Sequence, residues 1–272
     1  MEPHNNLLRE MLSYFNLSEL PFTKELDLHK LIRLPSVEQA FLQLQYLVSL
    51  KGIGILTGKS GTGKSCLLRI LADTLSTSSY RLVYLNHSSV STTEFYSHLA
   101  CGFGLQPFGR RSSLFRKVRE QIESLYSSKR QTSILVIDEA HHLSMDILQE
   151  LRMLSNFAFD SKCFLIVLFC AQEDFLLKMR LASLESLANS ISVIVKLEGL
   201  SQDETCSYIE KRISDSGCST PLFTKSALNA VHLASGGCMR VINTIALSSL
   251  NKVFLQKGKQ VEAEHVQMAI AR

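Results

Sequence analysis

Five short apolar runs recur along the first 200 residues, and helical patterns separate them. The runs are nearly continuous in apolar residues instead of alternating with polar ones, which is typical of strands covered on both faces. They are GIGIL (52–56), RLVYLN (81–86), SILVID (133–138), FLIVLF (164–169) and SVIVKL (192–197). The alternation of strand and helix predicts an α/β domain with a doubly wound, parallel, five-stranded sheet.

Only helical patterns follow Leu200. Ser201 and Glu204 form a capping box, and Gly217 suits the end of the same helix. Further helical patterns near 224–235, 239–256 and 261–271 complete a small all-α lid domain. We therefore expect a nucleotide-binding domain at 36–199 and a helical lid at 200–272.

The first 35 residues form a third piece. An apolar stripe predicts a short amphipathic helix, made by Leu7, Leu8, Met11, Leu12 and Phe15. The LPF sequence at 20–22 then predicts a turn. We expect segment 1–35 to pack on the nucleotide-binding core.

Composition indicates an ordinary globular protein. Of 272 residues 46% are hydrophobic and 20% charged, and Gly (13) and Pro (5) are sparse, which argues against disorder. The net charge of +4 identifies no partner. The seven cysteines include no CxxC pair and indicate buried thiols in a reducing compartment. The N-terminus does not resemble a signal peptide, and no apolar run is long enough to span a membrane, so we expect a cytoplasmic protein without membrane contact.

A phosphate-binding loop follows the first strand. Residues 58–65, GKSGTGKS, fit G-x-x-x-x-G-K-[ST] between a strand and a helix. Glycines let backbone N–H groups surround phosphate oxygens, and the helix dipole favours the anion. Lys64 is predicted to reach the β and γ phosphates, and Ser65 to bind Mg²⁺. The residues expected to contact ATP are Gly58, Lys59, Ser60, Gly61, Thr62, Gly63, Lys64, Ser65 and Cys66.

An acidic pair ends the third strand. Asp138 is predicted to hold Mg²⁺, and Glu139 to polarise the attacking water, which favours hydrolysis over phosphoryl transfer to another substrate. The alternative is an exposed acidic turn. DEAH (138–141) also spells a helicase motif, but the roughly 70 residues after Leu200 are too few for the second helicase domain. We expect His141 and His142 to start a helix and not to bind a metal.

The chain resembles an AAA+ ATPase of the ExeA/GspA type, a group that includes transposition ATPases related to TnsC and TniB. The matching segments extend over nearly the whole chain: YFNLSELPF, TEFYSHLACGFGL, DEAHHLSMDILQELRMLSNF, IVLFCAQEDF, LSQDETCSYIEKRI and SGGCMRVIN. The resemblance implies that the FLIVLF strand lies between the phosphate-loop strand and the Asp138 strand.

The resemblance also implies further site residues. Gln172 matches the sensor 1 place, where it would touch the γ-phosphate or the water, unless it is a turn residue. Arg240 matches the sensor 2 place on the lid, where it would bridge the lid to the γ-phosphate, unless it is a surface arginine. Asn156 is a weaker candidate that caps a turn in the alternative interpretation.

One position departs from the family pattern. Ser190 stands where such ATPases carry an arginine that reaches the ATP of a neighbouring subunit, and Arg180, ten residues earlier, is the candidate substitute. An arginine finger contributes about 10³–10⁵ in rate. The departure predicts slow hydrolysis, or hydrolysis that needs DNA or a partner.

A basic cluster suggests a DNA partner. Arg110, Arg111, Arg116, Lys117 and Arg119 lie on a predicted helix whose opposite face is apolar. Such residues bind the phosphates of double-stranded DNA without sequence preference, although a solvated helix face is the plain alternative. The resemblance thus favours an ATP-dependent assembly factor, a transposition helper that forms a ring or filament on target DNA and works with a transposase.

Two other functions remain open. One is a secretion-assembly ATPase like ExeA; members of that type continue past the lid into a membrane span, whereas this sequence ends after EAEHVQMAIAR. The other is a nucleotide switch that binds ATP and hydrolyses it poorly. An ATP analogue that resists hydrolysis separates the switch from the ATPase.

Overall fold

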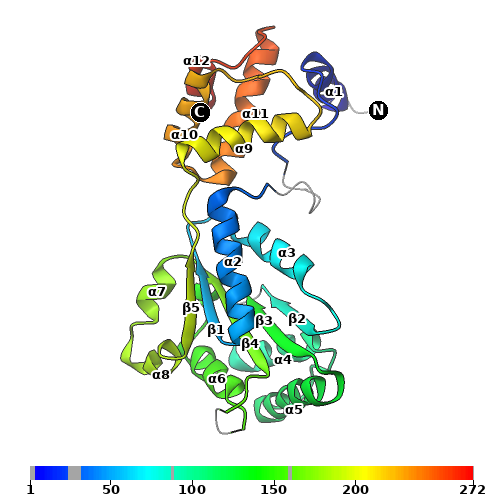
Figure 1. Ribbon diagram of the computed structural model, residues 1–272, viewed down its shortest axis with the longest axis vertical. Helices are drawn as coiled ribbons and strands as arrows, with labels where there is room; N and C mark the ends of the chain where they lie inside the picture. The colour runs from blue at the N-terminus through cyan, green and yellow to red at the C-terminus, as the bar shows by residue number, and fades with distance from the viewer. Residues whose placement is uncertain (1–3, 24–31, 87–88, 159–160, 272) are drawn as a thin grey trace. The chain divides into compact units, whose positions relative to one another are not determined.

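The computed structural model describes residues 4–23, 32–86, 89–158 and 161–271 (Figure 1). Its chain divides into two compact units, which we describe separately. The first, the α/β unit, contains Gln39–Gly58 and Lys64–Leu197. The second, the helical unit, contains Met1–Glu38, Lys59–Gly63 and Glu198–Arg272.

The α/β unit is built on a parallel five-stranded sheet. Its strands are β1 (Ile53–Thr57), β2 (Tyr80–Leu85), β3 (Thr132–Ile137), β4 (Leu165–Ala171) and β5 (Ile191–Lys196). The strand order is β2-β3-β4-β1-β5, and every pairing is parallel. The five predicted strands are therefore confirmed, and β4 lies between β1 and β3 as the resemblance implied.

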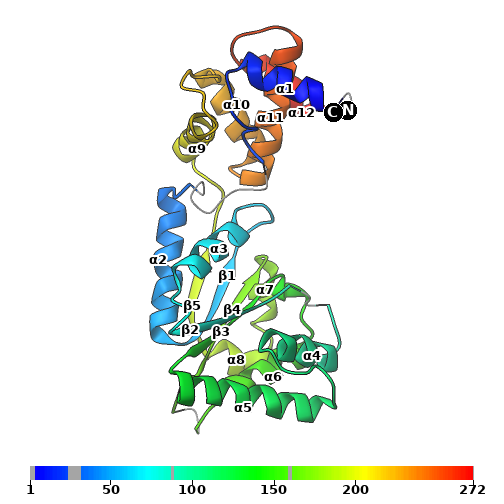
Figure 2. The ribbon, with the colours of Figure 1, turned by 90° about the vertical axis from the view of Figure 1, so that its right-hand side faces the viewer.

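Helices cover both faces of this sheet, as Figures 1 and 2 show. Gly54 of β1 packs so closely on Leu47 of α2 that a Cβ there would lie 2.3 Å from its Cδ2. The opposite face packs against a core cluster with residues from α4, α5, α6, α7 and α8. The bounds are α2 (Pro35–Leu50), α3 (Lys64–Thr74), α4 (Thr92–Gly102), α5 (Arg111–Lys129), η2 (Ala140–His142), α6 (Met145–Ser155), α7 (Asp174–Lys178), η3 (Ala182–Leu184) and α8 (Glu185–Ala188).

Local sequence explains where several helices begin and end. Ser91 caps α4 in a capping box with Glu94, and the Ser144 side chain accepts the Ile147 N–H at the start of α6. α5 ends at Arg130, which has left-handed backbone torsions. These caps fix the starts of α4 and α6 and the end of α5, the three helices that pack on β2, β3 and β4.

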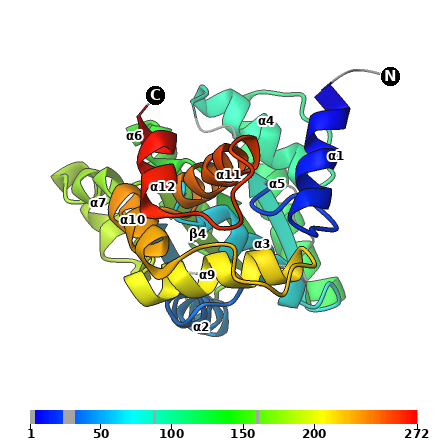
Figure 3. The same ribbon diagram turned by 90° about the horizontal axis from the view of Figure 1, so that it is seen from above.

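The helical unit contains α1 (His4–Tyr14), α9 (Gln202–Asp215), α10 (Lys225–Ser235), α11 (Met239–Leu255) and α12 (Ala263–Ile270). The predicted capping box of Ser201 and Glu204 is present at the start of α9. Gly217 follows the end of α9 with φ of +95°, a conformation that favours glycine. α11 lies between α1 and α12 (Figure 3).

The N-terminal segment makes its contacts within the helical unit. Tyr14 of α1 donates to the Gly258 carbonyl (3.2 Å) and meets the Phe254 ring edge-on, with centroids 5.6 Å apart. The Ser18 hydroxyl donates to the Ser216 carbonyl at 2.9 Å. These contacts lie within the helical unit, and the expected packing of segment 1–35 on the nucleotide-binding core stays a prediction. Part of that segment, 24–31, lies outside the described residues.

Within the described ranges, no helix combines the length and the apolar character needed to cross a membrane.

Core packing in the α/β unit gives a stability prediction. Leu148 of α6 is fully buried, whereas Leu177 of α7 is 63% exposed. We expect Leu148→Ala to lower the free energy of unfolding by about 2–5 kcal/mol, because it leaves a cavity in the core. Leu177→Ala is the matched control and should change it by less than about 1 kcal/mol. Urea unfolding of both variants checks this, and equal midpoints would show that α6 does not pack as described.

Candidate functional site

The phosphate-binding loop connects β1 to α3. Lys64 is the first residue of α3, and its side chain is buried although it is charged. Its ammonium group donates to the Gly58 carbonyl at 2.6 Å, so the side chain folds back over the start of its own loop. Gly63, just before it, has φ of +103°, which a residue with a Cβ rarely adopts. Ser65 is exposed and Cys66 is half-buried.

The tip of the loop, Lys59–Gly63, belongs to the helical unit and contacts the start of α11. The Arg240 N–H donates to the Gly61 carbonyl and its guanidinium to the Ser60 hydroxyl, both at 3.1 Å. Gly61 has φ of +85°, and a Cβ there would lie 2.7 Å from the Cβ of Arg240. The loop tip therefore needs glycine at 61 both for its backbone torsion and for the approach of Arg240. Thr62 closes the turn by donating its hydroxyl to the Lys59 carbonyl at 2.9 Å.

Asp138 lies at the carboxyl end of β3 and is 8% exposed. Two donors hold its carboxylate: the Tyr84 hydroxyl at 2.6 Å and the Glu139 N–H at 2.9 Å. Burial and the hydrogen bond to Asp138 raise the pKa of Tyr84 far above its ordinary value. Burial, with the charge of Asp138, also raises the pKa of the Cys170 thiol on β4, while the charge of Lys64 opposes that shift.

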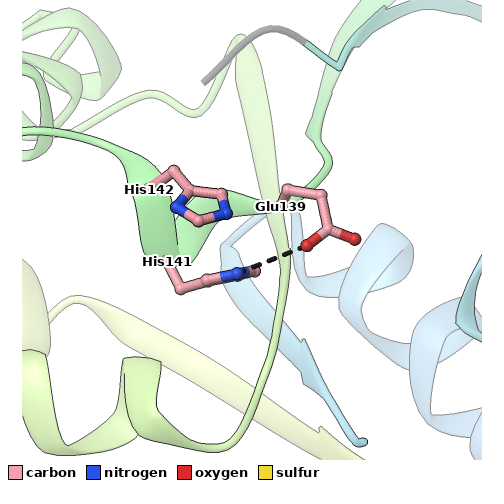
Figure 4. Close-up of side chains that lie close together, drawn as sticks. All are labelled: Glu139, His141 and His142. Atoms are coloured by element: carbon pink, nitrogen blue, oxygen red, sulfur yellow. Dashed lines mark ion pairs between the residues drawn. The ribbon is translucent and has the colours of Figure 1, made fainter. Parts of the chain in front are cut away.

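Glu139 begins a tight turn that η2 continues. Its φ of +51° is a left-handed conformation, rare outside glycine. One carboxylate oxygen lies 3.3 Å from Nε2 of His141, as the dashed line in Figure 4 marks. The Gln172 amide, just past the end of β4, approaches the same nitrogen at 3.3 Å. The structure thus brings Glu139 and Gln172 together around His141.

His141 is mostly buried, with 8% of its side chain exposed. Burial lowers its pKa, and the neighbouring His142 lowers it further, whereas Glu139 raises it. The ring is therefore neutral at pH 7 and carries one N–H. Among the described residues, Nδ1 has no hydrogen-bond partner, which favours the tautomer whose Nε2–H points to Glu139.

A small cavity of about 350 Å³ lies between α3 and the strands β2 and β3. Ser65 and Arg69 of α3 and Tyr84 of β2 line it, together with apolar side chains. Ser65 and Tyr84, the residue that donates to Asp138, therefore line the same cavity.

The five basic residues of the predicted DNA cluster divide into two groups. Arg111 forms an ion pair with buried Glu150, and Arg119 donates to the Asn156 carbonyl at 2.6 Å and stacks on Phe157. Both therefore support the packing of α5 on α6. Arg110, Arg116 and Lys117 are exposed. Arg116 is 74% exposed and forms a long 3.9 Å ion pair with Glu120 on the same helix.

Ser190 lies between α8 and β5 and donates its hydroxyl to the Ser186 carbonyl at 2.8 Å. It lines a polar cavity of about 740 Å³ with Lys51 and Arg152. Arg180, the suggested substitute, is exposed just after α7 and is absent from this lining. Asn156 is the C-terminal cap of α6, in line with its alternative interpretation.

Two neighbours of the acidic pair were missed by the sequence reasoning. Tyr84 is separated from Asp138 by 53 residues, but β2 pairs with β3 and Tyr84 lies opposite Val136. The sequence signal is a hydroxyl-bearing side chain between the apolar Val83 and Leu85. His141 was interpreted only as a helix start, although a histidine three residues after a strand-end aspartate lies within reach of that strand end.

This chain is similar to a known domain family and to two curated proteins. A family model described as an AAA domain matches residues 47–179. General secretion pathway protein A of Aeromonas hydrophila is 30% identical over 261 residues, 94% of this chain and 47% of that protein. ATP-dependent target DNA activator B of Escherichia phage Mu is 26% identical over 151 residues, 55% of this chain and 44% of that protein. The chain therefore spans about half the length of these curated relatives.

A solved structure shows the same fold. Cdc6p from Pyrobaculum aerophilum superposes with a TM-score of 0.70 and 21% sequence identity, covering 91% of this chain and 69% of that one. The α/β fold predicted from the sequence is confirmed.

The contact between Tyr84 and Asp138 gives a prediction with a pH dependence. We expect Tyr84→Phe to lower the free energy of unfolding by about 1–2 kcal/mol at pH 7, because Asp138 loses a donor. Since the pKa of Tyr84 is raised on folding, the neutral hydroxyl stabilises the protein below the unfolded pKa near 10, and this contribution declines as the pH rises above it. Urea unfolding should show that the difference in free energy of unfolding between wild type and Tyr84→Phe is smaller at pH 10.5 than at pH 7. A difference that is the same at both pH values would contradict the hydrogen bond from Tyr84 to Asp138.

Proposed function

Because the chain carries an AAA domain over residues 47–179, we propose that it binds ATP with Mg²⁺ and hydrolyses it. The resemblance to ExeA/GspA-type and transposition ATPases is confirmed by the relatives described above. One observation of the α/β unit carries the proposal. Lys64, Asp138, Glu139 and Gln172 all follow the carboxyl ends of the neighbouring parallel strands β1, β3 and β4, the edge where ligands bind in open α/β sheets.

The residues present fit a magnesium ion. Asp138 presents a buried carboxylate held in place by two donors, and Ser65 offers an exposed hydroxyl at the start of α3. Both are oxygen donors, which Mg²⁺ prefers. When bound, the ion would neutralise charge on the β and γ phosphates.

Side chains of this protein would position the phosphates and the attacking water. Glu139 would orient the attacking water and polarise it, and its half-exposed carboxylate is accessible for that role. Lys64 would exchange the Gly58 carbonyl for phosphate oxygens. Gln172 would position the water or the γ-phosphate. Arg240 would exchange its bond to Ser60 for the γ-phosphate.

We further propose that the protein assembles on double-stranded DNA in its ATP-bound form, as a transposition helper that works with a transposase. Support comes from the relative whose name describes an ATP-dependent target DNA activator, and from the exposed Arg110, Arg116 and Lys117. Arg111 and Arg119 have structural partners and take no part in this proposal. In a ring or filament, Arg152 or Arg180 of one copy would reach the ATP bound by the neighbouring copy. Either arginine would then replace the one that Ser190 lacks.

A role in secretion is the alternative, because the general secretion pathway relative matches over 94% of this chain. A weakly hydrolysing ATP switch is a third candidate, favoured by Ser190. The domain boundaries at 35/36 and 199/200 also stay predictions. All seven cysteines are free, which suits the cytoplasm.

The nucleotide chemistry is tested with two substitutions. We expect Lys64→Ala to weaken ATP binding about 10- to 100-fold, because charge-assisted hydrogen bonds to phosphate are lost. Glu139→Gln should retain ATP binding and lower kcat about 10²- to 10⁴-fold, because the base is lost. Calorimetry measures binding, and phosphate release measures turnover.

Arg9→Ala, on the α1 helix of the helical unit, is a matched control for removing one positive charge. Unchanged affinity and turnover in Lys64→Ala would overturn the proposed function. Binding that survives while both wild type and Glu139→Gln fail to turn over would instead favour the switch.

The DNA proposal is tested by removing the two exposed charges of α5. We expect Arg116→Ala combined with Lys117→Ala to weaken ATP-dependent binding to duplex DNA, and to reduce the slope of log K against log salt by about 2. Lys257→Ala combined with Lys259→Ala removes the same charge elsewhere and should leave the slope unchanged. Fluorescence anisotropy at several salt concentrations measures this. Equal binding with and without nucleotide would contradict ATP-dependent assembly and favour the secretion alternative.

A further inference from the structure

We propose that Glu139, His141 and His142 bind one divalent transition-metal ion of the zinc class, in contrast to the expectation from the sequence that the two histidines bind no metal. One ligand-type atom from each side chain lies within 4.8 Å of the others. Figure 4 shows the three side chains gathered at one turn, with the Glu139 carboxylate directed at His141 and the two imidazole rings side by side. The ring centroids are 4.1 Å apart. Small side-chain rotations bring three such atoms around a single ion.

The ligand chemistry selects the type of ion. Two imidazole nitrogens and one carboxylate oxygen form a His₂Glu set, which suits zinc and leaves a fourth position for water. Mg²⁺ prefers an octahedral shell of oxygens and dehydrates reluctantly. The cluster therefore discriminates against the magnesium ion proposed for Asp138 and Ser65.

The backbone of the turn is fixed before any ion arrives. The Glu139 N–H is bonded to Asp138, and Lys178 of α7 donates to the carbonyls of His141 and Leu143. A fixed turn lowers the entropic cost of gathering the ligands. Glu139 and His142 are exposed, so an ion can enter directly from solvent.

Two features keep this site weak. The Gln172 amide nitrogen lies 3.3 Å from Nε2 of His141 and has to move aside for an ion. Coordination through Nε2 moves the ring proton to Nδ1, which is buried without a partner among the described residues. An unsatisfied buried donor weakens binding about 10- to 100-fold. We therefore expect a reversible site and not a permanent structural one.

Metal binding at this site should affect ATP hydrolysis, and this expectation rests on the proposed function. Glu139 is the residue proposed to polarise the attacking water, and its carboxylate cannot do so while it coordinates an ion. Zinc-class ions should therefore inhibit ATP hydrolysis without displacing ATP.

The test uses Co²⁺ as a spectroscopic probe and Zn²⁺ as a competitor, added to the full chain without nucleotide. Wild type should bind one Co²⁺ with visible d–d absorption and no thiolate charge-transfer band, and Zn²⁺ should remove the signal. His142→Ala should bind at least tenfold more weakly. His98→Ala, which removes a histidine of α4, is the matched control and should bind as wild type does.

A ligand replacement keeps the test independent of folding defects. His142→Cys retains a metal ligand and should add a thiolate-to-cobalt charge-transfer band that wild type lacks. Equal Co²⁺ binding by wild type and His142→Ala would overturn the proposal, and so would a thiolate band in wild type. Absence of binding by wild type would also overturn it.

The experiments can contradict the metal site without contradicting the proposed function, and the proposed function without contradicting the metal site. Co²⁺ binding is measured without ATP, so it can succeed in a protein that does not hydrolyse ATP. In an active protein, Zn²⁺ inhibition, measured relative to the turnover of each protein without zinc, should weaken at least tenfold in His142→Ala. Equal inhibition of both proteins would contradict the assignment to Glu139, His141 and His142.

Discussion

The register of three parallel strands determines the chemistry available to the α/β unit. Ile55, Phe169 and Ile137 lie side by side on β1, β4 and β3, so the residues that follow them meet at one edge. A phosphate loop leaves the first strand there, an acidic pair the third, and Gln172 the strand between them. Parallel strands put all their carboxyl ends on the same side, and no antiparallel arrangement of these segments would do so.

At that edge, both carboxylates are held by neutral donors from the same chain. Tyr84 donates to Asp138, and the neutral His141 ring lies against Glu139. A buried carboxylate without a donor is costly, so the Tyr84 hydroxyl stabilises Asp138, which is buried, whereas Glu139 is half-exposed and also meets water. Ligand binding at this edge would therefore replace one polar contact of a carboxylate with another.

The strands and the phosphate loop could be predicted from the sequence, whereas most contacts around the site could not. Continuous apolar runs gave all five strands, and the glycine pattern located the loop, because both depend on local residue type. The resemblance supplied the strand order. The contact between Tyr84 and Asp138 was missed because it depends on the register between β2 and β3. The engagement of Arg111 with Glu150 was missed for a similar reason: charge patterning shows which face of a helix is basic, but not which arginine finds a buried acid on another helix.

The loop tip illustrates how one glycine serves two requirements. Gly61 adopts a left-handed backbone conformation. It also lets Arg240 approach so closely that a Cβ at position 61 would lie 2.7 Å from the Cβ of Arg240. The bond from the Arg240 N–H uses a donor of the first turn of α11, which has no partner inside its own helix. An anion at the loop would compete for the same guanidinium that now contacts Ser60. A phosphate accepts stronger hydrogen bonds than a hydroxyl, so the proposed role of Arg240 requires only that its bond to Ser60 be exchanged, while its backbone bond to Gly61 can stay in place.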